Sequence, residues 1–322
     1  MEAESKRRFQ DLSVAEVWQL VQSLDSLHEG ELGISMLVAC GERAVPALRS
    51  FLLYGRPSGI FTPRQRAVRA LAELGAKDTL LEYLRAELPS PDPVVAHGEE
   101  AVKNTAARSL ANWKTDDVFY ALLNVLERHR LTGVIEALGE FGRAEAVPVL
   151  VLTLEDDFCR SFAEDALLKI GVPARPALID AARTPDPSGS NESSSSRRRR
   201  KSALRLLEDI QLTVDDWPLL AALLYDRDAE IAARTAIVAL KFSNGEEQTI
   251  AIRRLIAALS TGDWLLQGEI ESCLDEHFDV AHSLICAEID RRRVREFRAQ
   301  SLDTVSRLLL AIVTRHVRQK VV

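Results

Sequence analysis

The chain has 322 residues, of which 47% are hydrophobic, and its formal net charge is −7. The longest apolar clusters, such as residues 308–313, are far shorter than the roughly 20 residues that a membrane span requires. An acidic total is also atypical of nucleic-acid binding, which depends on neutralising phosphates with basic side chains. Residues 1–13 are charged and no apolar run follows them. We therefore expect a water-soluble, cytoplasmic protein without membrane contact.

The cysteine pattern shows neither CxxC spacing nor the framework of a small disulfide-rich domain. Each cysteine lies among apolar residues in a helical pattern, and we expect reduced cysteines that act as small hydrophobic side chains. They are Cys40, Cys159, Cys273 and Cys286.

The N-terminal segment contains a helix-start signal. Ser13-Val-Ala-Glu16 has the spacing of a capping box, in which the serine and the glutamate each bond to the other's backbone amide. We expect a helix to begin directly after Ser13, and residues 1–28 to form capping helices ahead of the repeats.

A repeated pattern follows, in which an apolar residue, usually followed by Gly, ends the first helix of each unit. It recurs roughly every 28 to 40 residues, which is the length of one antiparallel helix pair plus insertions. Units of this kind stack because none of them buries its apolar face alone. The sites are Cys40-Gly41, Leu74-Gly75, Trp113-Lys114, Phe141-Gly142, Ile170-Gly171, Ile210-Gln211 and Phe242-Ser243.

Glycine and proline mark the ends of the expected helices. A glycine after the first helix predicts a left-handed cap, because only glycine adopts that conformation at little cost. Proline near the start of a helix, as in Thr62-Pro63 and Val172-Pro173, loses no hydrogen bond because the first amides have no helical partner. No stretch alternates with period two, so we expect an almost wholly α-helical chain.

These units resemble HEAT repeats, in the short form also found in phycobilisome-lyase-like proteins. The resemblance is carried by an Ala-Leu-x-x-hydrophobic-Gly block and a following Ala-Val-Pro-x-Leu block, at residues 41–48 and 137–150. It implies an all-α fold, a right-handed α-α superhelix of about seven to eight helix pairs over residues 29–290, whose second helices line a concave face.

Several functions occur in proteins with this fold. Deoxyhypusine hydroxylases carry His-Glu pairs in several repeats to hold two irons, but the only such pair here is His28-Glu29. Bilin lyases leave no compact motif to place, and HEAT-like DNA glycosylases use a basic groove. We expect a non-catalytic scaffold, without catalytic residues or cofactor, that binds a protein or peptide partner on its concave face. The alternatives are a bilin-lyase-like enzyme or enzyme-assisting protein, and a nucleic-acid binder.

Three segments outside the repeat pattern are candidates for function. The first, residues 184–202, contains a serine tract and a basic run with almost no apolar residue, and we expect a flexible insertion. Part of the basic run is alternatively the start of the helix that ends at Ile210. The candidate partner-binding residues are Arg197, Arg198, Arg199 and Arg200.

The second segment has the mirror-symmetric spacing C-x3-H-x4-H-x3-C, which places each Cys and His pair on one helix face. Two antiparallel helices joined at residues 278–280 would allow the four side chains to converge on a tetrahedral zinc. Cys273 and His277 also fit an ordinary core stripe with Ile270, Leu274 and Phe278, which is the interpretation that we prefer. The four residues of the spacing are Cys273, His277, His282 and Cys286.

The third segment, residues 291–322, has nine basic and two acidic residues. We expect it to form a basic C-terminal helix that closes the open end of the repeat stack with its apolar face. The alternative is a docking patch for an acidic partner or nucleic acid, made of Arg291, Arg292, Arg293, Arg295 and Arg298.

Overall fold

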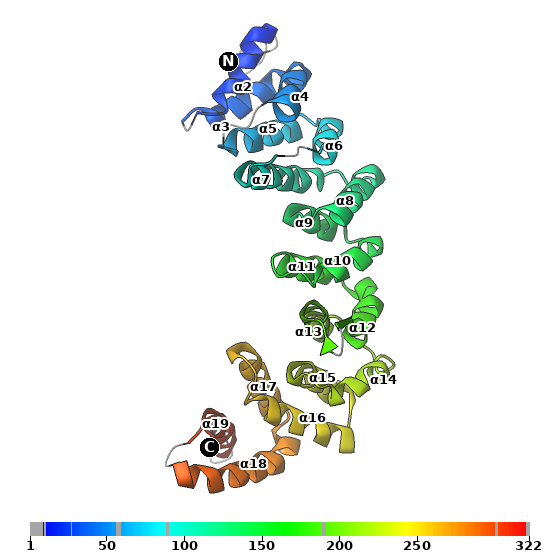
Figure 1. The fold of residues 1–322 in the computed structure, drawn as a ribbon, viewed down its shortest axis with the longest axis vertical. Helices are drawn as coiled ribbons and strands as arrows, with labels where there is room; N and C mark the ends of the chain where they lie inside the picture. Colours follow the sequence, from blue (N-terminus) through cyan, green and yellow to red (C-terminus); the bar gives the residue numbers. More distant parts are fainter. Residues whose placement is uncertain are drawn as a thin grey trace. The chain divides into compact units, whose positions relative to one another are not determined.

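The computed structural model describes residues 9, 11–26, 28–55, 59–87, 90–188, 191–299 and 302–319, without the side chains of 187–188, 294–299 and 318–319. The chain divides into two compact units, Met1–Ile170 and Gly171–Val322. The protein is all-α, and its helices pack as consecutive pairs, as the repeat pattern predicts (Figure 1). No helix among the described residues combines the length and apolar character needed to cross a membrane.

Unit 1 begins with α2 and continues as helix pairs. Ser13 accepts a hydrogen bond from the Glu16 amide and Glu16 accepts one from the Ser13 amide, which confirms the predicted capping box. The helices are α2 (Val14–Ser23), α3 (Gly30–Ala39), α4 (Val45–Tyr54), α5 (Thr62–Glu73), α6 (Lys77–Arg85), α7 (Pro93–Leu110), α8 (Asp116–Arg128), α9 (Thr132–Phe141), α10 (Val147–Thr153) and α11 (Arg160–Ile170), with short 3-10 turns at Gly41–Ala44 and Ala144–Ala146.

The pairs of unit 1 form two layers. The first-helix layer consists of α3, α5, α7, α9 and α11, each packed against the next, and the second-helix layer consists of α4, α6, α8 and α10. Figure 1 shows both rows, with α7, α9 and α11 side by side and α8 and α10 beside them. The apolar stripes of both rows face each other, and residues such as Leu71, Leu138 and Leu167 are fully buried between them.

Glycine has two roles in this fold: it ends helices, and it allows neighbouring helices to pack closely. Gly142 has φ +66° and ψ +22°, which confirms the predicted left-handed cap there, and Gly41 and Gly75 also have positive φ, at +66° and +72°. Gly171 has φ +72° but ψ −135°, so it is not the predicted left-handed cap, although the positive φ still favours glycine. Gly139 serves close packing instead, since a Cβ there would lie 2.8 Å from the Ala166 Cα of α11. The close contact between α9 and α11 therefore depends on small residues.

Unit 2 continues the pairing with longer helices. Its elements are a 3-10 turn (Val172–Ala174), α12 (Arg175–Arg183), the short antiparallel pair β1 (Pro187–Ser188) and β2 (Asn191–Glu192), α13 (Ser194–Asp209), α14 (Trp217–Leu220), the 3-10 helix η4 (Ala221–Tyr225), α15 (Ala229–Phe242), α16 (Gly245–Ala258), α17 (Trp264–Glu276), α18 (Phe278–Ala299) and α19 (Thr304–Gln319). Here α13 packs on α15 and α15 on α17, while α16 packs on η4 and α18.

The C-terminal helix α19 packs against α17 and α18. Its buried stripe is Val305, Leu309 and Ile312, and the imidazole of His316 stacks on the ring of Phe278 with centroids 3.9 Å apart. The helix before it, α18, runs without a break through residue 290, so the expected border between repeats and capping segment lies inside a helix.

Candidate functional site

Basic side chains of first helices cap the second helix that precedes them. The Arg64 Nη1 of α5 donates to the Phe51 carbonyl at the end of α4, at 3.0 Å. Lys103 of α7 donates to the carbonyl of Ala86 after α6, at 2.6 Å, and Arg200 of α13 donates to that of Ala182 in α12, at 2.8 Å. A positive charge is favourable there, because the last carbonyls of a helix are unpaired and carry partial negative charge.

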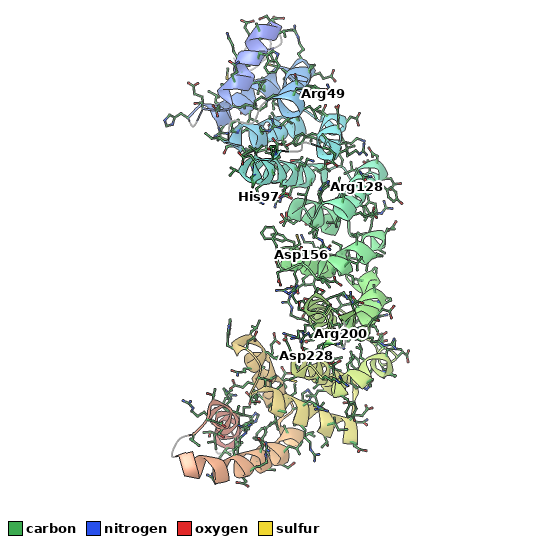
Figure 2. All side chains as sticks on the ribbon, viewed as in Figure 1. Arg49, His97, Arg128, Asp156, Arg200 and Asp228 are labelled. Carbon is green, nitrogen blue, oxygen red and sulfur yellow. The ribbon has the colours of Figure 1, made fainter. Side chains whose placement is uncertain are left out.

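The expectation of a flexible insertion over residues 184–202 is wrong for its C-terminal part, which is helical and agrees with the alternative that the basic run starts a helix. A helix, α13, begins at Ser194 after the N-cap Ser193, and the basic run lies on it. Arg199 and Arg200 are 6% and 2% exposed, and they pair with Asp186 at 2.7 Å and Glu192 at 2.8 Å (Arg200 is labelled in Figure 2). These two arginines are internal to the fold, whereas Arg197 is exposed and Arg198 is half-buried.

The Cys and His side chains of the second segment do not converge. Cys273 is buried in α17, and burial raises the pKa of its thiol to about 12, which disfavours the thiolate that zinc requires. His277 follows α17, and only His282 and Cys286 of α18 approach each other, with Nε2 and Sγ 3.5 Å apart. Within the described ranges, no three His, Cys, Asp or Glu side chains form a group suited to a metal ion.

The basic residues of the third segment begin on α18. Arg291 and Arg292 both pair with Glu288, at 2.7 and 2.6 Å, and Arg292 also reaches Asp303 at 2.7 Å. Arg293 is exposed. The side chains of Arg295 and Arg298 lie outside the described residues.

Two of these arginines line a groove between α16 and α18, which we call the α16–α18 groove. Its volume is about 440 Å³. Ile256, Ala257, Leu284 and Ala287 form an apolar floor, and charged side chains form the rim. The complete lining is Arg253, Ile256, Ala257, Ser260, Leu284, Ala287, Glu288, Arg291 and Arg292.

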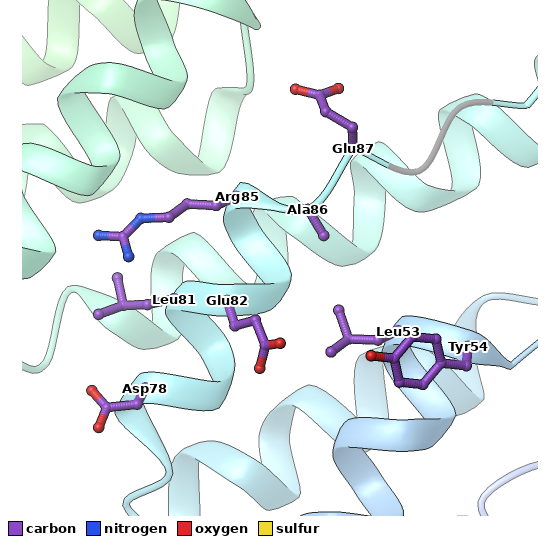
Figure 3. Close-up of a pocket in the computed structure, with 8 residues that line it drawn as sticks. All are labelled: Leu53, Tyr54, Asp78, Leu81, Glu82, Arg85, Ala86 and Glu87. Carbon is purple, nitrogen blue, oxygen red and sulfur yellow. The ribbon is translucent and has the colours of Figure 1, made fainter.

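A groove of similar construction lies in unit 1 between α4 and α6, which we call the α4–α6 groove. Its volume is about 690 Å³. Figure 3 shows Leu53 of α4 and Glu82 of α6 pointing toward one another across it. Tyr54 is 72% exposed although it is a large aromatic residue. The complete lining is Leu53, Tyr54, Asp78, Leu81, Glu82, Arg85, Ala86 and Glu87.

An ion pair lies at the rim of the α4–α6 groove. Arg49 of α4 donates to Glu82 with Nε 2.6 Å from Oε2, and its guanidinium lies 6.0 Å from the centre of the Tyr54 ring. The hydrogen bond from Arg49 lowers the pKa of Glu82, which is therefore ionised at neutral pH. Asp78 and Glu87 add further acidic groups, and Arg85 is the basic group of the lining.

Sequence reasoning did not find the α4–α6 groove. One signal for it was present, because Tyr54 does not belong to the buried stripe of Ala47, Leu48 and Leu52. An aromatic residue off the core stripe, directly before Gly55, is a candidate for exposure. The opening itself depends on the spacing of two helices that belong to different repeats.

Comparison with known proteins concerns the fold alone. No protein-family model and no curated protein sequence matches the chain. The karyopherin Kap121p, bound to the extreme C-terminus of the protein phosphatase Cdc14p, aligns over 91% of this chain with 15% identity and a TM-score of 0.41, and the alignment spans 40% of the karyopherin chain. Human deoxyhypusine hydroxylase, in complex with glycerol, aligns over 87% of this chain and 97% of its own, with 18% identity and a TM-score of 0.30.

Proposed function

We propose that this protein is a non-catalytic scaffold that binds segments of protein partners on the face formed by its second helices. The observation that carries the proposal is the α4–α6 groove, in which the exposed Tyr54 stands beside an apolar floor and a charged rim. The floor consists of Leu53, Leu81 and Ala86. Its volume lies within the roughly 300–1,000 Å³ typical of ligand sites. Tyrosine is among the residues that most often anchor protein interfaces, because it buries much apolar area and keeps a polar tip.

The groove suits a peptide better than a compact small molecule. It runs between two helices of neighbouring repeats, and its lining residues Tyr54, Glu82 and Arg85 are exposed to solvent. Repeat stacks offer such extended surfaces because every unit adds another helix to the same face. The α16–α18 groove supports the same function, since it also lies between helices and also combines an apolar floor with a charged rim.

Affinity capture from the native host tests this function. Wild-type protein and the double variant Leu53→Ser/Tyr54→Ser would be used as baits after mild crosslinking, with mass spectrometry of what is recovered. The matched control is Phe158→Ser in the turn before α11, which removes a side chain that is 77% exposed and does not line the groove.

We expect one or more proteins to be recovered with wild type and with Phe158→Ser, and to be depleted about tenfold with the groove variant. Circular dichroism would establish that the three baits have equal helix content. Recovery of the bait alone from all three, or equal recovery with the groove variant, would contradict the proposed function at this groove.

A further inference from the structure

We propose that the α16–α18 groove binds an acidic peptide segment that carries an aliphatic anchor residue. This inference rests on the proposed scaffold function and names the chemistry of one partner. Two observations carry it. Arginines outnumber carboxylates on the rim, and the apolar floor includes small side chains that leave space in the groove.

The rim has more positive than negative charge. Three of its residues are arginines, Arg253, Arg291 and Arg292, and one is a carboxylate, Glu288. Hydrogen bonds from Arg291, the strongest cause, and from Arg292 lower the pKa of Glu288, which is therefore ionised at neutral pH. Glu288 thus serves two guanidinium groups, and Asp303 also pairs with Arg292 at 2.7 Å. Arg253, on the opposite side of the groove, is exposed and has no carboxylate partner among the described residues.

Nearby residues of α16 and α18 strengthen this excess. The guanidinium of Arg254 lies 5.7 Å from the centre of the Tyr225 ring, and Arg293 is exposed on α18. Asp290 is an exposed acid of α18, but it does not line the groove. A carboxylate brought to Arg253 from outside would therefore enter a region of positive potential.

The floor selects for an apolar side chain between such carboxylates. Ile256 is 5% exposed and Leu284 is half-buried, so an apolar surface lies at the bottom of the groove. Ala257 and Ala287 are both exposed, and their single methyl groups leave the space of about 440 Å³ open. A leucine or isoleucine placed there would lose water contact, which is favourable by about 25 cal/mol per Å² of apolar area.

The same features favour a peptide over a nucleic acid. Binding to a nucleic acid requires a track of cations that are free to neutralise successive phosphates. Two of the three rim arginines are already engaged by Glu288. The apolar floor would also remain without a partner beneath a phosphate backbone, whereas an acidic peptide with an aliphatic residue matches both parts.

Fluorescence anisotropy tests the inference on the full-length chain. The probe is a fluorescein-labelled peptide of about ten residues, composed of Glu, Ser and two central Leu residues. Two probe controls replace either every Glu by Gln or both Leu by Ser. The protein variants are Arg253→Glu on the rim and Ala287→Phe in the floor, and the charge-matched control is Arg128→Glu on α8, an exposed arginine outside the groove.

We expect the acidic probe to bind wild type and Arg128→Glu with affinities within about twofold of each other, and Arg253→Glu at least about tenfold more weakly. Ala287→Phe should also weaken binding, because it fills the floor, and both control probes should bind more weakly than the acidic one.

Three results would overturn the inference. They are an absence of binding to wild type at low salt, an equal loss with Arg128→Glu and Arg253→Glu, or a short DNA duplex that binds more tightly than the probe with the same dependence on Arg253. If the peptide fails while capture of a partner through Tyr54 succeeds, the acidic-peptide inference fails and the scaffold function stands.

Discussion

The guanidinium of Arg64 in α5 and the carboxylate of Glu99 in α7 form a buried ion pair with Nε and Oε1 2.8 Å apart. Their side chains are 4% and 6% exposed. The Tyr83 hydroxyl of α6 donates to Glu99 at 2.6 Å, and Arg64 also donates to the end of α4. The buried cluster of Arg64, Glu99 and Tyr83 thus connects four successive helices of unit 1, α4 to α7.

Removing one member of this pair should destabilise the protein strongly. Arg64→Ala leaves the Glu99 carboxylate buried without its counter-ion, and we expect a loss of about 3–5 kcal/mol in the free energy of unfolding. Urea unfolding followed by circular dichroism measures it. The control is Arg49→Ala, which breaks an exposed pair with Glu82 and should cost about 0–1 kcal/mol. Similar losses for both variants would contradict the central role of the buried pair.

The arginines of α13 should separate into two classes. Arg200→Ala removes the bonds to the Ala182 carbonyl and to Glu192 from a side chain that is 2% exposed, and we expect a loss of about 3–5 kcal/mol. Arg197→Ala changes an exposed side chain on the same helix and should stay within about 0.5 kcal/mol of wild type. Thermal unfolding of the two variants measures the difference, and equal melting temperatures would refute it.

Two glycines without close neighbours should respond to alanine in opposite directions. An added Cβ meets no atom within 4 Å at either Gly142 or Gly268. The effect of alanine on stability therefore depends on the backbone conformation at each position. Gly142 has φ +66°, and Gly142→Ala should cost about 1–2 kcal/mol. Gly268 lies inside α17, and Gly268→Ala should stabilise the protein by about 0.5–1 kcal/mol. Urea unfolding of both variants checks the signs, and a change of equal sign would show that another factor dominates.

Local signals in the sequence predicted most of the fold but only part of the candidate site. The caps at Gly142 and Ser13 were predictable because the residues that form them are neighbours along the chain. The sequence did not show that Arg200 is buried and Arg197 is exposed. The burial of Arg200 depends on a carbonyl of α12 and on Glu192, which only the folded chain brings close. Both grooves depend on gaps between helices of different repeats, for which the sequence carries no direct signal.

A carboxylate in unit 2 should make stability depend on pH. Burial raises the pKa of Glu208 in α13 to about 7, although Arg234 lies 3.5 Å away and acts in the opposite direction. Glu269, which also pairs with Arg234, and Lys241 face the same region, and Cys273 lies near enough to be influenced by Glu208. The folded state therefore holds a proton on Glu208 at a pH where the unfolded chain, with its ordinary value of about 4.3, has lost it.

The sign of the effect follows from proton linkage. Between about pH 4.3 and pH 7 the folded state binds more protons than the unfolded state, so the contribution of Glu208 to stability falls as the pH rises. Glu208→Gln carries no titratable proton and should lose this dependence. We expect the variant to gain about 2 kcal/mol relative to wild type between about pH 5 and pH 8, measured by urea unfolding at both values. In the control Glu82→Gln the difference from wild type should stay nearly constant over this range, since hydrogen bonding to Arg49 lowers the pKa of Glu82 and its linkage to stability lies at lower pH. A difference between Glu208→Gln and wild type that is constant over this range would show that Glu208 is ionised throughout in the folded protein.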